Sequence, residues 1–193
     1  MDIFYYYIII SAIVIEYFIS SISTILNMNS ISENLPPDFE SVYTKEKYSN
    51  SQKYLKIKSK FSLTSSSFSL ILILFVIHFG VFGFIDDFAR NQTSNPVYTG
   101  LIFFGIIFVI NDLINIPFSL YKNFVIEEKF GFNKMTISIF IKDKFKSYFL
   151  VFIIGGILMF SILSFFNYFD TIGWFIVWIF ITVFSIVIQP IFI

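Results

Sequence analysis

The chain of 193 residues contains no cysteine and a single histidine, His78. The absence of cysteine excludes disulfide bonds, thiolate zinc ligands and a thiol nucleophile. A lone histidine excludes the motifs in which two imidazoles bind one metal ion, so we expect no cofactor or metal site in this chain alone. Thirteen basic and thirteen acidic residues cancel, and we therefore expect no nucleic-acid partner.

Charged side chains are also scarce. They make up 13% of the chain, whereas soluble proteins carry about 25%. Hydrophobic residues reach 56% and aromatic residues 22%, including 29 phenylalanines. This composition leaves too few polar side chains to cover a soluble core, and it is too hydrophobic for a disordered chain. The composition therefore predicts an integral membrane protein that lies in the lipid bilayer.

Five apolar stretches are long enough to cross a bilayer, whose hydrocarbon core of about 30 Å needs about 20 helical residues. We therefore expect an all-α integral membrane fold with five transmembrane helices in one domain, residues 1–193. The expected spans are residues 3–26, 68–85, 97–121, 148–166 and 172–193.

The basic residues predict the orientation of these spans. Twelve of the thirteen lie in two loops, 27–67 and 122–147, and the remaining one is Arg90. Short loops that are rich in lysine stay on the cytoplasmic side of a membrane. We therefore expect both loops and the C-terminus in the cytoplasm, and the N-terminus outside.

The second half of the first loop has the pattern of a helix. From Thr44 onward it contains neither proline nor glycine, and Tyr48, Leu55 and Phe61 recur at loosely helical spacing. Thr44 is a suitable N-cap. We expect one long helix that continues into the second span, with a kinked helix lying on the membrane surface as the alternative.

Several polar residues interrupt the spans. Those at positions 112, 115 and 119 fall on one face of the third span, next to Pro117, which kinks a helix. Acids inside a membrane usually face a cavity or a bonding partner. We therefore expect either a chamber wall or hydrogen bonds between helices. The candidate chamber-lining residues are Asn111, Asp112, Asn115, Ser119 and Glu16.

The second lysine-rich loop contains a glycine between two phenylalanines. We expect Gly131 to adopt a positive φ in a turn that presents the rings of Phe130 and Phe132. Glu127 and Glu128 just before it are candidate partners for lysines of the first loop. An interfacial helix follows, because residues 135–146 alternate apolar residues with lysines.

Two segments resemble the N-terminal region of the type I CAAX prenyl endopeptidases, which are multispan zinc metalloproteases. The stronger match is IPFSLYKNFVIEEKFGFNKMT, residues 116–136. The second is LPPDFESVYTKEKYSNSQKYLKIKSKF, residues 35–61, in which Tyr48, Ser51 and Tyr54 keep the spacing of the family. The ending IVIQPIFI is similar to the exit of the fifth span in that family, so the resemblance covers essentially the whole chain.

The resemblance implies a zinc protease, but this chain lacks the zinc-binding motif of that family. Members of the family hold zinc through an HExxH helix, in which two imidazoles bind the ion and the glutamate activates its water. The chain has no such motif. We therefore expect the membrane chamber module of a CAAX-type zinc endopeptidase, which positions membrane-associated or prenylated substrate and is inactive alone. The alternative is a non-enzymatic multispan transporter or scaffold.

The resemblance also implies partners and a location. Six residues are expected to contact a downstream or associated zinc protease domain: Glu127, Glu128, Phe130, Gly131, Phe132 and Asn133. Zinc belongs to the full-length family, and the substrate is a membrane-associated peptide. The short second loop favours a bacterial cytoplasmic membrane, with the endoplasmic reticulum as the location in a eukaryote.

Overall fold

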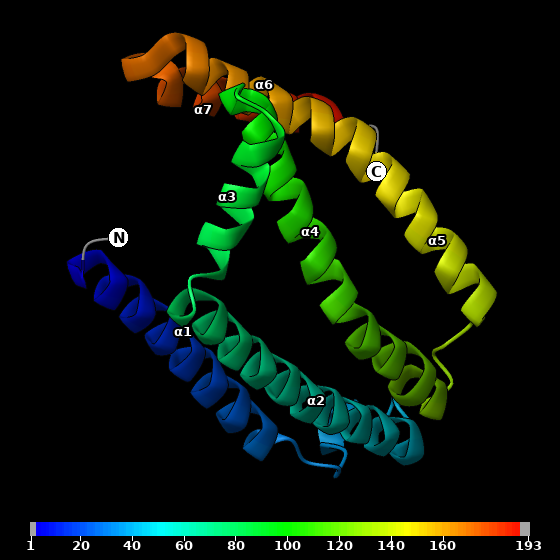
Figure 1. The fold of residues 1–193 in the computed structure, drawn as a ribbon. Helices are drawn as coiled ribbons and strands as arrows, with labels where there is room; N and C mark the ends of the chain where they lie inside the picture. Colours follow the sequence, from blue (N-terminus) through cyan, green and yellow to red (C-terminus); the bar gives the residue numbers. More distant parts are fainter. Residues whose placement is uncertain (1–2, 190–193) are drawn as a thin grey trace. The chain divides into compact units, whose positions relative to one another are not determined.

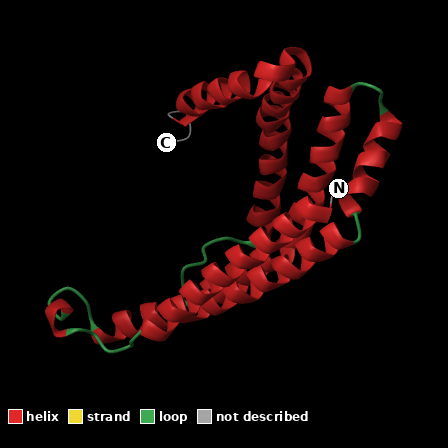
Figure 2. Ribbon diagram, turned by 90° about the vertical axis from the view of Figure 1, so that its left-hand side faces the viewer, coloured by secondary structure: helices red, strands yellow, loops and turns green. Residues whose placement is uncertain are grey.

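The computed structural model describes residues 3–189. Within that range the regular elements are all helical and no strand is present (Figures 1 and 2). The all-α part of the predicted fold is therefore confirmed. The helices are α1 (Ile3–Ser30), α2 (Lys45–His78), α3 (Val81–Gln92), α4 (Pro96–Tyr121), α5 (Ile137–Leu150), α6 (Gly156–Phe169) and α7 (Gly173–Ile188).

Four helical runs in the described residues are long and apolar enough to cross a membrane: Ile3–Ser30, Lys45–His78, Pro96–Glu127 and Ile137–Phe169. The third is α4 extended by a π-helical turn, η2 (Lys122–Glu127). In the fourth, α5 and α6 are joined by a second such turn, η3 (Val151–Gly155). The fifth predicted span corresponds to α7, a shorter apolar helix, and the last four residues of that span, 190–193, lie outside the described part.

The chain divides into two compact units, each considered by itself below. The first contains the residues up to Val81 together with Leu113–Met135. The second contains Phe82–Asp112 and the residues from Thr136 onward.

In the first unit, α1 and α2 lie side by side in antiparallel directions (Figure 1). The hydroxyls of Tyr17 and Ser67 are hydrogen-bonded at 2.6 Å, and the Tyr6 hydroxyl lies 3.4 Å from Nδ1 of His78. The end of α4 packs against α2 through aromatic rings. Phe61 stacks on Tyr121 with ring centroids 5.2 Å apart.

In the second unit, α6 and α7 form a helical hairpin. Phe165 and Phe180 meet edge to face, with centroids 5.2 Å apart. The start of α4 approaches α6 closely at Gly100, where an added Cβ would lie 2.8 Å from Cδ1 of Leu163. The glycine therefore permits this close packing, as small residues do between membrane helices.

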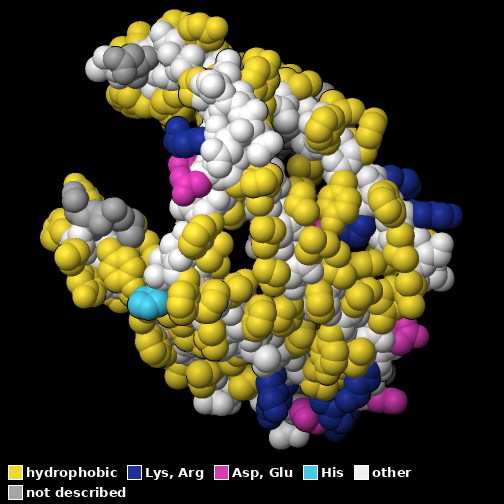
Figure 3. All heavy atoms as spheres, in the orientation of Figure 1, with side chains coloured by type: hydrophobic (Ala, Val, Ile, Leu, Met, Phe, Trp, Pro, Cys, Tyr) yellow, Lys and Arg dark blue, Asp and Glu magenta, His cyan; other side chains and the backbone are white. Residues whose placement is uncertain are grey.

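Few side chains are buried in either unit. The buried hydrophobic residues of the described part are Ala89, Val97, Ile126, Phe140 and Val177. Large apolar residues remain exposed along the helices, and hydrophobic side chains cover much of the face drawn in Figure 3. In water such a surface would be unstable, whereas in hydrocarbon it is solvated by lipid.

The long helix predicted from Thr44 is confirmed. Thr44 has extended backbone angles, and its side chain accepts a hydrogen bond from the Lys47 amide at 3.3 Å. The 34 residues of α2 follow without a break. At about 1.5 Å per residue the helix is about 51 Å long, which exceeds the bilayer core of about 30 Å.

The prediction that this helix runs on to residue 85 is wrong. Helix α2 ends at His78, and Gly80 has a φ of 65°, which is left-handed backbone. That conformation is open to glycine at little cost, and it turns the chain before α3 begins at Val81.

Replacing the helix cap tests the local account of α2. Thr44→Ala removes the acceptor of the Lys47 amide, which costs about 1 kcal/mol. We expect faster hydrogen exchange at the first amides of α2. Thr64→Ala is the matched control, because the Thr64 hydroxyl donates to the Lys60 carbonyl in mid-helix and caps nothing. Equal exchange at the α2 start in both variants would contradict the cap.

Candidate functional site

The turn after η2 lies within the first unit and is fixed by its own hydrogen bonds. Gly131 has a φ of 74°, which confirms the predicted positive-φ turn. The Glu127 carbonyl accepts from the amides of Phe132 and Asn133 at 2.9 and 3.2 Å. These bonds close the end of the helical run, and the glycine permits the reversal at a position where a side chain would be strained.

Asn133 holds the far side of this turn. Its amide nitrogen donates to the Glu128 carboxylate at 2.8 Å and to the Met135 carbonyl at 3.2 Å. Its side-chain oxygen accepts from the Met135 amide at 2.8 Å. The FGFN sequence therefore forms a bonded turn and not a loose loop.

Tyr54 of α2 connects this turn to the lysine-rich half of the helix. We call Tyr54, Glu127, Phe130 and Phe132 the Tyr54 cluster. The Tyr54 hydroxyl donates to Oε1 of Glu127 at 2.7 Å. Its ring packs edge to face against Phe130 and Phe132, with centroids 5.4 and 4.9 Å away. The prediction that the turn presents two rings is therefore confirmed, and both rings meet the same tyrosine.

The electrostatics of the cluster favour the hydrogen bond. Tyr54 lies well before the apolar stretch that begins at Phe68, outside the expected span. Hydrogen bonding to the Glu127 carboxylate raises the pKa of Tyr54 above its usual value, with burial and the negative charge adding to the effect. The phenol therefore stays protonated and remains a donor at neutral pH. Lys58 and Lys129 lie over the Tyr54 and Phe130 rings at 5.4 and 5.9 Å.

The pairing of Glu127 and Glu128 with lysines of the first loop is wrong for the described residues. Glu127 accepts from Tyr54, and Glu128 accepts from Asn133. Lys53 instead pairs with Glu33, and Lys45 pairs with Glu40, so both lysines bind acids of the same first loop. The side-chain donor to Glu127 is therefore a tyrosine hydroxyl and not a lysine ammonium group. The spacing in the sequence points to Tyr54, but no local pattern predicts it as the partner of Glu127.

Asp112 forms a second polar contact, within the second unit. Lys144 Nζ lies 2.5 Å from Asp112 Oδ1, and the Tyr148 hydroxyl donates to the other carboxylate oxygen. Lys144 and Tyr148 are one turn apart on the same side of α5. The side chains of Asp112 and Lys144 are 21% and 25% exposed. Of the two roles expected for Asp112, this contact favours a polar bond between helices.

The other predicted chamber residues are not gathered into one described site. Asn111 belongs with Asp112 to the second unit, whereas Asn115, Ser119 and Glu16 belong to the first. Glu16 is exposed on α1, and Ser119 is half-buried near the end of α4. Their common role as a chamber lining stays a prediction.

The residues present do not fit the zinc ion that the resemblance implies. Among the described residues, no group of three or more His, Cys, Asp or Glu side chains could hold a metal ion. His78 lies beside the Tyr6 hydroxyl and the Phe79 ring. No catalytic step can therefore be derived through a metal held by these side chains.

Comparison with known proteins identifies relatives of this chain. Residues 24–193 match the family described as CAAX prenyl protease N-terminal, five membrane helices. The chain is 33% identical over 172 residues to CAAX prenyl protease 1 of Saccharomyces cerevisiae, which covers 82% of this chain and 38% of that protein. It is 28% identical over 200 residues to the CAAX prenyl protease 1 homolog of Dictyostelium discoideum, covering 98% and 47% of the two chains.

A solved structure has the same fold. The crystal structure of S. mikatae Ste24p matches with a TM-score of 0.86 and 31% identity, over 97% of this chain and 47% of that chain. The chain therefore spans about two fifths to one half of the length of these three proteins.

Removing one hydroxyl tests the Tyr54 cluster. Tyr54→Phe keeps the ring contacts but leaves the Glu127 carboxylate without its donor, which costs about 1–2 kcal/mol. That cost raises the open population of the turn about 5- to 30-fold. We expect trypsin to cleave after Lys129 and Lys134 faster by a similar factor in the purified protein.

The matched control for this test is Tyr48→Phe. Tyr48 lies in the same helix, and its hydroxyl makes no hydrogen bond within the described part of the chain. We expect cleavage at the wild-type rate. The assigned contact is contradicted if Tyr54→Phe and Tyr48→Phe are cleaved equally fast.

Proposed function

Because the chain belongs to the CAAX prenyl protease N-terminal family, we propose that it is the membrane module of a zinc-dependent CAAX-type endopeptidase. In this role it positions a membrane-associated or prenylated substrate for proteolysis and is inactive alone. The observation that carries the proposal is the match to the Ste24p structure, which extends over 97% of this chain at 31% identity.

The chemistry of the described side chains supports a positioning role. Hydrolysis of a peptide by zinc needs imidazole or carboxylate ligands around one ion and a base for the water. The described residues supply no such group. Protein beyond these side chains must therefore supply the metal and the base, whether it is continuous with this chain or associated with it.

We place the contact with the zinc protease domain at the FGFN turn and the two glutamates before it. The turn is rigid because Tyr54, Asn133 and Gly131 fix its shape. The ring of Phe132 is still 58% exposed although it packs on Tyr54. A bonded turn with an exposed aromatic ring can be recognised by a partner at a low cost in conformational entropy.

The polar residues of the spans complete this proposal as the lining of a substrate chamber. They are Asn111, Asp112, Asn115, Ser119 and Glu16. Asp112 contributes to this lining through its contact with Lys144 and Tyr148, which holds a charged pair at the third expected span. Intramembrane polar groups of this kind often border a water-filled space.

The proposed orientation places the N-terminus outside and the C-terminus in the cytoplasm, with residues 27–67 and 122–147 on the cytoplasmic side. The lysine distribution supports it. For the location we now propose the endoplasmic reticulum membrane over the bacterial membrane favoured by the sequence. The support is that the relatives described above come from eukaryotes.

Cysteine labelling tests the orientation, because the chain has no native cysteine. Two single variants, Lys56→Cys in α2 and Ser94→Cys between α3 and α4, place exposed thiols on the two sides that the proposed orientation separates. In sealed vesicles of known sidedness, we expect a membrane-impermeant maleimide to label Ser94→Cys from the outer face. Lys56→Cys should react only after the vesicles are permeabilised. The opposite pattern would invert the proposed topology.

Protease activity tests the proposed function. Residues 24–193 can replace the matching segment of the S. cerevisiae relative, which retains the remainder of that protein. We expect the chimera to cleave a prenylated CAAX peptide, and a chelator to abolish the cleavage. The 193-residue chain alone should show no cleavage above the buffer control.

Two outcomes contradict the proposal. Cleavage by the 193-residue chain alone, at a rate proportional to its concentration, shows that it carries a catalytic site. A chimera that inserts into the membrane and elutes as one monodisperse species but stays inactive shows that the module does not serve this reaction. The unmodified yeast protein, purified in parallel, serves as the positive control.

A further inference from the structure

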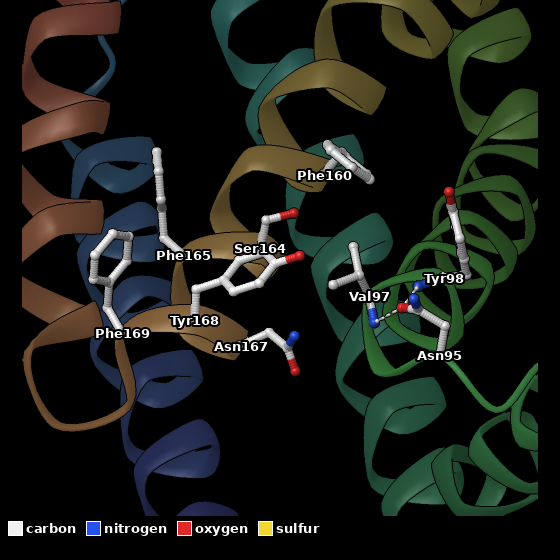
Figure 4. Close-up of a pocket in the computed structure, with 9 residues that line it drawn as sticks. All are labelled: Asn95, Val97, Tyr98, Phe160, Ser164, Phe165, Asn167, Tyr168 and Phe169. Carbon is white, nitrogen blue, oxygen red and sulfur yellow. Dashed lines mark hydrogen bonds between the residues drawn. The ribbon is translucent and has the colours of Figure 1, made fainter.

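The second unit contains a pocket between the first turn of α4 and the last turns of α6 (Figure 4). Its volume is about 750 Å³. Ligand pockets of proteins have volumes of about 300–1,000 Å³. Most of the described lining is aromatic, and none of its described side chains is charged. The described lining therefore suits a ligand with a large apolar body.

Three polar side chains of α6 face this pocket. Ser164, Asn167 and Tyr168 lie at positions i, i+3 and i+4, and thus on one side of the helix. In Figure 4 they extend toward Val97 and Asn95 at the start of α4. None of the three makes a side-chain hydrogen bond within residues 3–189. Ser161, one turn earlier, does bond, since its hydroxyl donates to the Ile157 carbonyl at 2.9 Å.

These groups are accessible from outside the protein: Tyr168 is 79% exposed, Asn167 is exposed and Ser164 is half-buried. Helix α6 ends the run Ile137–Phe169, one of the runs apolar enough to cross a membrane. A hydroxyl or amide next to an apolar medium is stabilised by a hydrogen-bonding partner. Three such groups on one side of α6 are therefore available to a ligand that brings hydrogen-bonding atoms into the pocket.

From these observations we propose that the pocket binds a neutral membrane lipid whose head group is a hydroxyl, the chemistry that sterols and diacylglycerols share. The rings of Phe160 and Tyr98 pack against its apolar body. Ser164, Asn167 and Tyr168 exchange hydrogen bonds with its hydroxyl. None of the described lining side chains is cationic, which disfavours a phosphate or carboxylate head.

The position of the pocket agrees with this ligand. It lies where α4 begins and α6 ends, and thus at one end of two apolar runs, where head groups meet the hydrocarbon. Tyrosine is favoured at that depth because its ring is apolar and its hydroxyl is polar. The proposal needs the chain to lie in a bilayer, but it needs neither protease activity nor a particular orientation.

Photolabelling of the 193-residue chain in lipid nanodiscs tests the proposal. Three diazirine probes are compared at equal concentration: a sterol, a diacylglycerol and a phosphatidylcholine. We expect the sterol or the diacylglycerol to label peptides containing residues 95–98 or 160–169, as mapped by mass spectrometry. The labelling should saturate and fall at least fivefold when the unlabelled lipid of the same class is added in excess.

Variants of the pocket provide the control. The triple variant Ser164→Ala, Asn167→Leu, Tyr168→Phe keeps the bulk of the side chains and removes their hydrogen-bonding groups. We expect the saturable labelling of this variant to fall at least fivefold. Ser161→Ala should be labelled to the same extent as the wild type. Should the triple variant fail to purify as a folded species, Asn167→Leu alone should lose more than half of the labelling.

Three outcomes overturn the proposal. The first is labelling of these peptides that no unlabelled lipid competes away, which indicates general exposure to the bilayer. The second is saturable labelling by phosphatidylcholine alone. The third is unchanged labelling in a folded variant that lacks the polar groups. An inactive CAAX chimera leaves each of these results unaffected, so the two proposals fail independently.

Discussion

The lack of water in the bilayer core governs most of this structure, because every backbone amide and carbonyl there must find its partner inside the protein. A helix satisfies these groups within one segment, and within the described residues each apolar stretch is accordingly helical. The same solvent removes the reason to bury apolar side chains. Rings such as those of Phe152 and Trp174 remain exposed without cost, and buried hydrophobic residues are few. What hydrocarbon does penalise is a polar side chain without a partner.

Two polar contacts join distant segments, one at Asp112 in the third expected span and one in the Tyr54 cluster outside the expected spans. Asp112 on α4 is 32 and 36 residues away in sequence from Lys144 and Tyr148 on α5. Tyr54 on α2 is 73 residues before Glu127. Each contact brings a carboxylate to a donor on another element. Because leaving one of these groups unpaired is expensive, each bond also specifies which surfaces meet, whereas apolar packing in lipid selects neighbours only weakly.

Sequence reasoning succeeded where the cause was local. The cap at Thr44 and the turn at Gly131 each depend on a few adjacent residues and a known backbone preference. It failed at Gly80, because the glycine lies in an apolar run whose hydrophobicity predicts a span and hides the break. It also failed for Glu127, because matching acids to lysines by charge ignores geometry. Tyr54 has the shape that reaches the carboxylate, and a contact 73 residues apart leaves no local pattern.

The way the chain uses its polar groups separates two kinds of site. Carboxylates such as Asp112, Glu127 and Glu128 are engaged by donors of neighbouring segments, so they are held in place and not directed at one reacting centre. Groups committed in this way make a rigid frame, and in the proposed function such a frame orients substrate without touching the bond that breaks. The polar side of α6 differs, because its hydroxyls and amide meet a pocket and not a neighbouring helix. These accessible groups lie at the end of an apolar run, where the head group of a membrane lipid can complete their hydrogen bonds.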